Sequence, residues 1–327
     1  MSKIGIITPL WERGLSYTAL NFYHALSEKH KTGMLTYPSN IKKQLRMNIR
    51  NEFDVPGLCV YPKSEILHED LKRWMKPYNI ILFMEERLGG WLEAAKDAGK
   101  KTVNYICEAM SPRENDMARE FDLVIAPRKI DNAVPIKLGV DIDFFKPKEL
   151  TEEDKKKRKK VRVFAPMGWG GDYDRRNNDA ITKALTRVQC RDKTEILIHR
   201  QGPLEVVVDH MVRHATSIFG RVEMRDTYQE SDMCVYCPKW ERNDVTKMEA
   251  MACGLPVVGC VPKNKAESYD GVYEKAAIPD VHLLSVAIAE TSEGDLEKQK
   301  REARDMAVEL YDWGKNKQEF LKLMGDL

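Results

Sequence analysis

The most informative stretch of the chain is Trp240–Gly259, WERNDVTKMEAMACGLPVVG. Asn243 and Asp244 are favourable residues for starting a helix, because their side chains can accept hydrogen bonds from its first amides. Gly254 suits the left-handed position that ends a helix, and Pro256 follows two residues later. The pattern therefore predicts a loop, then a short helix that ends before Gly254, then a short buried strand.

Two carboxylates flank the start of this predicted helix. Glu241 lies in the loop before it, and Glu249 lies near its middle. The free amides and the positive dipole end at a helix start suit a phosphate group. Carboxylates beside such amides can accept hydrogen bonds from the hydroxyls of a sugar linked to that phosphate. The same spacing also fits a buried, capped helix with two surface glutamates, so the residues alone leave both interpretations open.

The spacing of these glutamates resembles a family signature. Glu241 and Glu249, separated by seven residues and followed by AMACGLPVV, resemble the E-x7-E motif of retaining GT-B glycosyltransferases, especially glycosyltransferase family 4. The resemblance implies an α/β GT-B fold, in which two Rossmann-like domains with parallel sheets face each other across a cleft. It also implies transfer of a hexosyl or pentosyl group from a nucleotide-diphosphate sugar to an acceptor hydroxyl, with retention and without a metal or other cofactor.

The family's residue roles can be carried over by position. In that family the first glutamate faces the donor sugar and the second holds the nucleotide ribose, which implies a catalytic role for Glu241 and a nucleotide-binding role for Glu249. The resemblance and the predicted helix start also make Asn243, Val245 and Thr246 candidate donor-binding residues.

Three departures from the family pattern concern the donor, and one of them is that Gly170 stands where the family has an arginine early in the loop before the second domain's first helix. Asp244 stands where the family usually has a glycine, and its carboxylate would repel a diphosphate unless it turns away as the helix cap. After Gly259 the chain keeps Glu267 but lacks the paired glycines that usually precede it. These differences bear on the identity and pose of the donor rather than on the fold.

A glycine-rich loop after the predicted strand 161–165 is the second candidate donor segment, PMGWGGDYDRRNN. Arg175 and Arg176 provide positive charge at a helix entrance, and arginine pairs with phosphate in bidentate fashion. In the resemblance Arg176 takes the place of a lysine and Asn177 that of a glycine. We expect both arginines to act in catalysis. Glycines that let the backbone approach the donor closely are Gly168, Gly170 and Gly171.

The length of 327 residues is sufficient for two domains. We expect an acceptor domain at 1–147, a charged linker at 148–160, a nucleotide-sugar domain at 161–304 and a C-terminal helix at 305–327. In the family such a helix crosses back onto the first domain. The lysine-rich linker run could alternatively be a nuclear or nucleic-acid-binding signal.

Charge and hydropathy exclude some classes of protein. Charged residues make up 32% of the chain but nearly cancel to a net charge of +2, which gives no general case for nucleic-acid binding. No apolar run reaches the roughly 18 residues that a membrane-spanning helix needs. Seven cysteines form no disulfide framework, and we expect Cys234 and Cys237 to be core thiols. These features favour a reduced, cytoplasmic protein.

Strands and helices alternate in the first half, which favours a parallel sheet. Glu108 follows a predicted strand, where open α/β sheets bind ligands, so it is either a candidate for the acceptor side or an ordinary loop carboxylate. For Gly14 it is the family resemblance that implies an acceptor-side place, because the loop that contains it would border the cleft where acceptor and donor meet. Residues 41–51 predict a basic amphipathic helix that includes Lys42, Lys43 and Arg46. These cations could grip an acidic acceptor or rest on the inner membrane surface, or the helix could simply have a solvated face.

The acceptor is not identified by the sequence, and a glycan, a lipid-linked molecule and a small molecule all remain open. Three alternative functions also remain. The chain could be a nucleotide-sugar binding protein that has lost catalysis, or an enzyme similar to UDP-sugar epimerases. It could also glycosylate a modified DNA base, as some phage enzymes do, although the near-neutral charge gives this little support.

Overall fold

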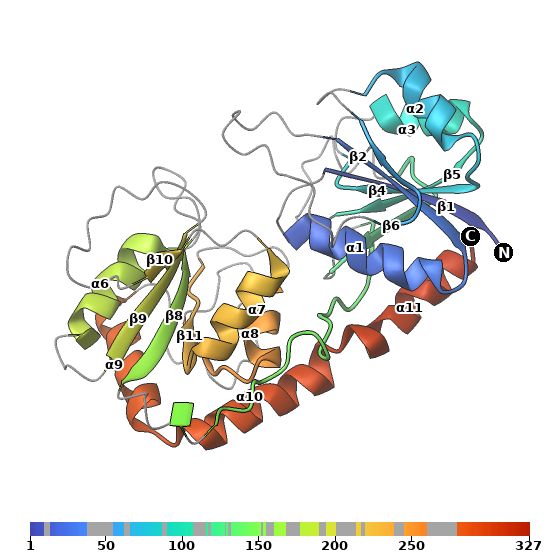
Figure 1. Ribbon diagram of the computed structural model, residues 1–327. Coiled ribbons are helices and arrows are strands. Elements are labelled where there is room, and N and C mark those ends of the chain that lie inside the picture. Colours follow the sequence, from blue (N-terminus) through green and yellow to red (C-terminus); the bar gives the residue numbers. More distant parts are fainter. Residues whose placement is uncertain are drawn as a thin grey trace. The chain divides into compact units, whose positions relative to one another are not determined.

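The computed structural model describes residues 1–9, 14–37, 55–61, 66–86, 90–106, 116, 119–127, 129, 132–151, 153–154, 160–167, 177–189, 194–200, 214–216, 220–238, 245–259 and 280–327. The chain forms two compact units (Figure 1). Unit 1 comprises Met1–Leu138 and Trp313–Leu327, and unit 2 comprises Gly139–Asp312. Both are α/β units built on a parallel sheet, which confirms the predicted fold class.

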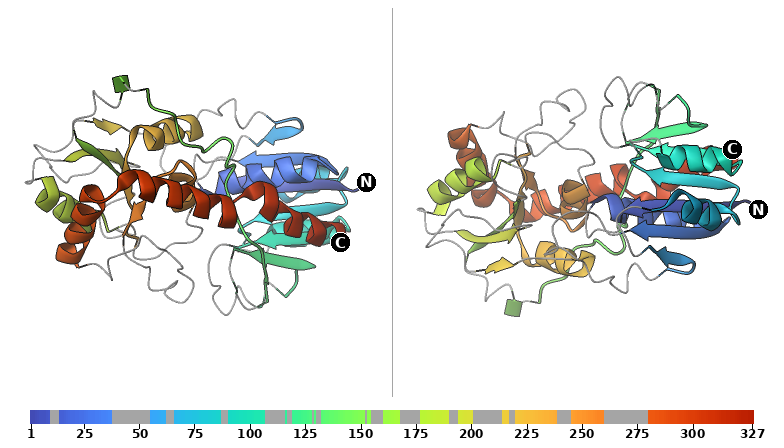
Figure 2. Two further views of the ribbon diagram at one scale, coloured as in Figure 1. Left: turned by 90° about the horizontal axis from the view of Figure 1, so that it is seen from below. Right: turned by 90° about the horizontal axis from the view of Figure 1, so that it is seen from above.

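Unit 1 contains a seven-stranded parallel sheet in the order β3-β2-β1-β4-β5-β6-β7. Its strands are β1 (Lys3–Pro9), β2 (Lys31–Tyr37), β3 (Leu58–Val60), β4 (Ile80–Met84), β5 (Lys101–Tyr105), β6 (Leu123–Ala126) and β7 (Val134–Pro135). The helices are α1 (Gly14–Ser27), α2 (His68–Met75), α3 (Gly90–Asp97) and α11 (Trp313–Gly325). Helices α1 and α11 cover one face of the sheet, and α2 and α3 cover the other (Figures 1 and 2).

The C-terminal helix α11 packs on α1. The rings of Phe22 and Phe320 stack with centroids 4.3 Å apart, and Trp313 lies beside Phe22 at 5.7 Å. The indole Nε1 of Trp313 donates a hydrogen bond to the backbone oxygen of Asn21. The last helix of the chain is therefore an integral part of the core of unit 1.

Unit 2 contains a five-stranded parallel sheet in the order β10-β9-β8-β11-β12. Its strands are β8 (Val161–Met167), β9 (Thr194–Arg200), β10 (His214–Thr216), β11 (Met233–Val235) and β12 (Val257–Val258). Its helices are α6 (Asn178–Gln189), α7 (Arg221–Glu230), α8 (Val245–Ala252), α9 (Val281–Glu293) and α10 (Leu296–Leu310). Alternate strand residues point to opposite faces, so α6 and α9 share one core, and α7, α8 and α10 share the other.

The observed boundaries differ from the expected ones at three places. The expected end of the first domain at residue 147 is too late, because Phe145 of the following segment is fully buried in the core of unit 2. The return segment begins at Trp313 rather than at residue 305. A single helix over 295–323 was expected, but it breaks at 311–312, where the amide of Val140 donates to the oxygen of Tyr311 (2.8 Å).

Other sequence-based expectations fall wholly or mostly on residues that the structure does not describe. A helix expected at about 204–214 lies almost entirely outside the described residues, and its last residue, His214, begins strand β10 instead. The expected basic helix at 41–51 also lies outside them, as does most of the lysine-rich linker run. Within the described part of the chain, no helix has both the length and the apolar character needed to cross a membrane.

The two cysteines of the C-x-x-C pair point into different cores. Cys234 packs with α7, α8 and α10, whereas Cys237 packs with α6 and α9. Cys234 is a buried thiol that forms no disulfide, as expected. Cys237 is disulfide-bonded, so the expectation of two core thiols is wrong for this residue. Because Cys237 is the third residue after Cys234 along extended chain, the two side chains point to opposite faces and cannot pair with each other or share a metal ion.

The end of α8 confirms the expected left-handed glycine. Gly254 has φ of 82°. Its amide donates to the oxygen of Met251 (2.9 Å), and the amide of Leu255 donates to that of Ala250 (2.9 Å). These two bonds form a Schellman motif, which satisfies carbonyls that the helix itself leaves without a partner.

The Gly254→Ala variant should therefore be destabilised. A Cβ at this residue would be strained at positive φ and would lie 3.1 Å from Cγ of Pro147. We expect the free energy of unfolding to fall by about 1–3 kcal/mol in urea titrations. Gly90→Ala is the control, because a Cβ there would meet nothing within 4 Å. Equal stability of the two variants would contradict the assignment.

Candidate donor site

The strand order of unit 2 brings the two candidate donor segments to one edge of its sheet. From β8 the chain adds β9 and β10 on one side, and then β11 and β12 on the other. The order reverses between β8 and β11, and open α/β sheets bind ligands at the carboxyl ends of such strands. The glycine-rich loop leaves the sheet after β8, and the segment with the two glutamates leaves it after β11. The topology therefore places the starts of both segments side by side.

Helix α8 begins at Val245, as the sequence predicts, and carries Glu249 in its second turn. Glu249 is only 7% exposed, and its Oε2 accepts a hydrogen bond from the hydroxyl of Tyr228 at 3.2 Å. Val245 and Thr246, in the first turn, are partly exposed. This burial shows that the interpretation of Glu249 as a surface glutamate is wrong. A carboxylate buried this deeply needs specific hydrogen-bond partners.

Asn177 connects the two segments directly. Its backbone has φ of 55°, the left-handed conformation that favours glycine and that asparagine tolerates better than most residues. This conformation explains why asparagine can stand at a position that resembles a family glycine. The side chain is buried, and its Nδ2 donates to the backbone oxygen of Cys237 at 2.8 Å. Asn177 thus ties the entrance of α6 to the chain that leaves β11.

Several expected site residues lie outside the described part of the chain. On the donor side these are Gly168, Gly170, Gly171, Arg175, Arg176, Glu241, Asn243 and Asp244. On the acceptor side they are Lys42, Lys43, Arg46 and Glu108. Gly14 is the first residue of α1, directly following the loop after β1.

Two further residues lie where the strand order of unit 1 reverses, between β1 and β4. Glu85 follows β4 with φ of 62°, an unusual conformation for a non-glycine residue. The neighbouring Glu86 is buried. Its backbone amide donates to Oδ1 of Asn104 at 3.1 Å, and its backbone oxygen accepts from Nδ2 of Asn104 at 2.9 Å. Burial, together with the negative charges of Glu86 and Glu85, raises the pKa of Tyr37. Their position after the strand was evident from sequence, but neither the burial nor the backbone conformation was.

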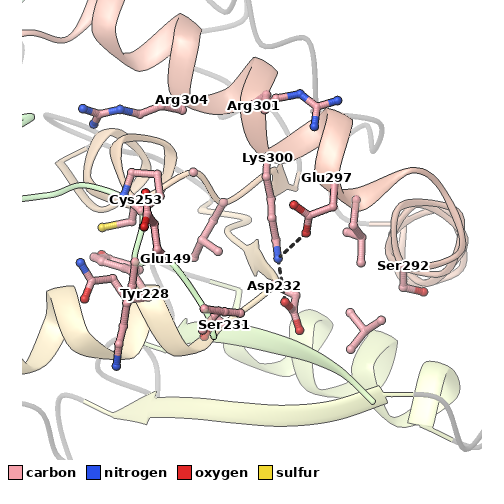
Figure 3. Close-up of a pocket in the computed structure, with 18 of the residues that line it drawn as sticks. Glu149, Tyr228, Ser231, Asp232, Cys253, Ser292, Glu297, Lys300, Arg301 and Arg304 are labelled. Carbon is pink, nitrogen blue, oxygen red and sulfur yellow. Dashed lines mark hydrogen bonds and ion pairs between the residues drawn. The ribbon is translucent and has the colours of Figure 1, made fainter. Parts of the chain in front are cut away.

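A pocket of about 1260 Å³ lies at the opposite edge of the unit 2 sheet (Figure 3). Its walls include residues that come just before β11 and β12, among them Asp232 and Leu255. Lys300 bonds Asp232 at 2.8 Å, and its Nζ lies 3.6 Å from Glu297, one turn away on the same helix α10. Burial raises the pKa of the Cys253 thiol, which makes this thiol a poor nucleophile. The pocket thus lies toward the starts of these strands, whereas the candidate donor site lies where the strands end, and Tyr228, which lines the pocket, also bonds Glu249.

No group of three or more metal-ligating side chains is found among the described residues. Lys247, in the first turn of α8, is 4% exposed and is a buried cation that the sequence analysis did not single out.

Comparisons with known proteins bear on the fold and on the class of protein. Residues 168–292 match the model of the glycosyl transferases group 1 family, and the match includes the segment with the two glutamates and all but the first two residues of the glycine-rich segment. No curated protein matches the chain by sequence. The fold is GT-B, and the group 1 domain within it indicates a glycosyltransferase.

Three solved structures illustrate the fold. Anabaena HepE, in complex with UDP and glucose, is similar with a TM-score of 0.76 at 14% identity, over 100% of both chains. Sucrose-phosphate synthase from Thermosynechococcus elongatus reaches 0.66 at 13% identity, over 100% of this chain and 99% of that one. A putative UDP-N-acetylglucosamine 2-epimerase from Listeria monocytogenes reaches 0.65 at 11% identity, over 99% and 95%.

The contact of Asn177 predicts an order of stability among its variants. Asn177→Gly keeps the left-handed backbone but loses the bond to the oxygen of Cys237, whereas Asn177→Ala also strains the backbone. We expect losses of about 1–2 kcal/mol for glycine and about 2–3 kcal/mol for alanine, measured by urea titration. A glycine variant less stable than the alanine variant would show that the backbone conformation is not the constraint.

Proposed function

We propose that the protein transfers a sugar from a nucleotide-diphosphate sugar to an acceptor hydroxyl, with retention and without a divalent metal. The observation that carries this proposal is the buried Glu249 on α8, at the edge where the strand order of the group 1 domain reverses. The resemblance of Glu241 and Glu249 to the E-x7-E motif supports retention. HepE was solved with UDP-glucose and with UDP and glucose, which makes UDP-sugars the first donors to test.

The proposed chemistry assigns different tasks to the two segments. As the bond between the sugar and the diphosphate breaks, negative charge grows on the leaving phosphate. Arg175, Arg176 and the amides at the start of α8 would stabilise that charge, in place of a metal ion. Glu241 would orient the donor sugar, and Glu249 would hold the ribose.

The acceptor remains a separate question. The acceptor would bind to unit 1 and would be a glycan, a lipid-linked molecule or a small molecule. The residues that would receive it are Gly14, Glu108 and the basic residues of 41–51. Contact of those cations with an anionic membrane surface would favour a lipid-linked acceptor.

A second candidate is an epimerase acting on UDP-sugars, because the Listeria protein shares the fold. Purified protein incubated with a UDP-sugar and no acceptor distinguishes the two functions. An epimerase converts the sugar while it remains linked to UDP or releases it as an epimer. A glycosyltransferase needs an acceptor to turn over at its full rate. A protein that only binds nucleotide sugars would do neither.

Glu249→Ala tests the assignment of the nucleotide. If Glu249 bonds the ribose, the variant should bind the free nucleoside diphosphate more weakly by about 1.5–3 kcal/mol, because the lost hydrogen bond involves a charged group. Isothermal titration calorimetry measures this affinity, and circular dichroism checks the fold. Glu309→Ala, which removes an exposed carboxylate of α10, is the matched control and should bind normally. Unchanged affinity of Glu249→Ala would remove the assignment.

The double variant Arg175→Gln/Arg176→Gln tests the leaving-group charge. We expect kcat to fall much more than donor affinity, because the charge on the phosphate is largest in the transition state. Arg301→Gln, at the pocket on the opposite edge of the sheet, should leave kcat unchanged. A kcat of the double variant within about threefold of the native value, or about 0.7 kcal/mol, would mean that other groups hold the phosphate.

A further inference from the structure

The hydroxyl of Tyr228 is aimed at the helix that carries the second glutamate of the motif. Tyr228 lies on α7, is fully buried, and donates to Oε2 of Glu249 at 3.2 Å. The same hydroxyl lies 3.4 Å from the backbone oxygen of Thr246, so its proton is directed at two acceptors on α8. Because Thr246 and Glu249 are three residues apart, they lie on one face of the helix.

The ring of Tyr228 is fixed by aromatic neighbours. Its edge contacts are with Phe164 of β8, at 5.3 Å and 90°, and with Phe145, at 6.3 Å and 64°. Phe145 is itself buried against Phe144, and the guanidinium of Arg221 lies over both rings at 5.2 and 4.8 Å. Such packing leaves the tyrosine ring little freedom to turn, so its hydroxyl is a donor of fixed position.

A fixed donor has a specific consequence for a buried carboxylate. Glu249 can adopt several rotamers, and only some of them would present the carboxylate to a ribose. The bond from Tyr228 favours the rotamer that directs Oε2 toward α7, and it offsets part of the cost of burying the charge. The orientation is therefore set before any ligand binds, which lowers the cost of ordering on binding.

We infer that Tyr228 is a positioning residue of the nucleotide site, which orients Glu249 for the two ribose hydroxyls of a nucleoside diphosphate. This inference rests on the proposed function, because it takes Glu249 as the ribose ligand. Tyr228 itself need not touch the nucleotide. A role exerted only through Glu249 predicts that the two residues are coupled energetically.

A double-mutant cycle tests this coupling. The probes are UDP, GDP and ADP, and the one that binds the native protein most tightly is used throughout. Its dissociation constant is measured by calorimetry for the native protein, Tyr228→Phe, Glu249→Ala and the double variant. We expect Tyr228→Phe to weaken binding by about fivefold or more, and to change it less than twofold when Glu249 is already alanine.

Tyr61→Phe is the matched control. In unit 1 the hydroxyl of Tyr61 donates to Oδ2 of Asp70 at 2.7 Å. The Tyr61→Phe variant therefore removes the same kind of tyrosine–carboxylate bond at a place remote in sequence from Glu249. It should leave nucleotide affinity unchanged. In steady-state kinetics Tyr228→Phe should raise the donor KM and leave kcat within about twofold, since the ribose contact is made equally in the ground and transition states.

The possible outcomes distinguish failure of the inference about Tyr228 from failure of the proposed nucleotide site. If Tyr228→Phe weakens binding equally with and without Glu249, the tyrosine acts through general packing and the inference is overturned. Unchanged binding by Tyr228→Phe, when Glu249→Ala binds weakly, overturns the inference alone. Unchanged binding by Glu249→Ala, or no binding of any probe, overturns the proposed nucleotide site itself. Should Tyr228→Phe be only marginally stable, the thermal shift produced by the probe gives the same comparison.

Discussion

The guanidinium of Arg304 is the contact on which the organisation of unit 2 most depends. It donates to the backbone oxygens of Phe145 (2.9 Å), Ala252 (2.7 Å) and Ile142 (3.0 Å). One side chain of α10 thereby joins the segment that enters unit 2 to the last turn of α8. A cation at the carboxyl end of a helix also complements its dipole. Because the same segment supplies Phe145 to the core around Tyr228, the position of α8 and the packing beneath Glu249 are set together.

Parallel strand order explains how residues far apart in sequence can serve one site. In each unit the chain first extends the sheet on one side and then returns to extend it on the other. The two loops at the point of return leave adjacent strands in the same direction. In unit 2 these are the glycine-rich segment and the segment with the glutamates, and Asn177 joins them with a single hydrogen bond. In unit 1 the corresponding place holds Glu85 and Glu86.

Local patterns predicted the elements whose causes are local. The start of α8 at Val245 and the left-handed Gly254 followed from cap residues and a glycine–proline pair. The break between α10 and α11 did not follow from local patterns, since it lies where Tyr311 and Asp312 pair with Val140, more than 150 residues earlier. The bond between Tyr228 and Glu249 spans two helices, and no motif contains the tyrosine. The burial of Glu249 likewise depends on helices α7 and α10, so the sequence left its two interpretations open.

The place of α11 in unit 1 has a consequence for biosynthesis. Trp313 comes 292 residues after Asn21, to which it is hydrogen-bonded, so the face of α1 that receives it must wait until α11 has been synthesised. At about 5–20 residues per second, that interval lasts roughly 15–60 s. During this time Phe22 has neither Trp313 nor Phe320 against it. Unit 2 is continuous in sequence and can complete its core on the ribosome, so the unit that is synthesised first is the one that is finished last.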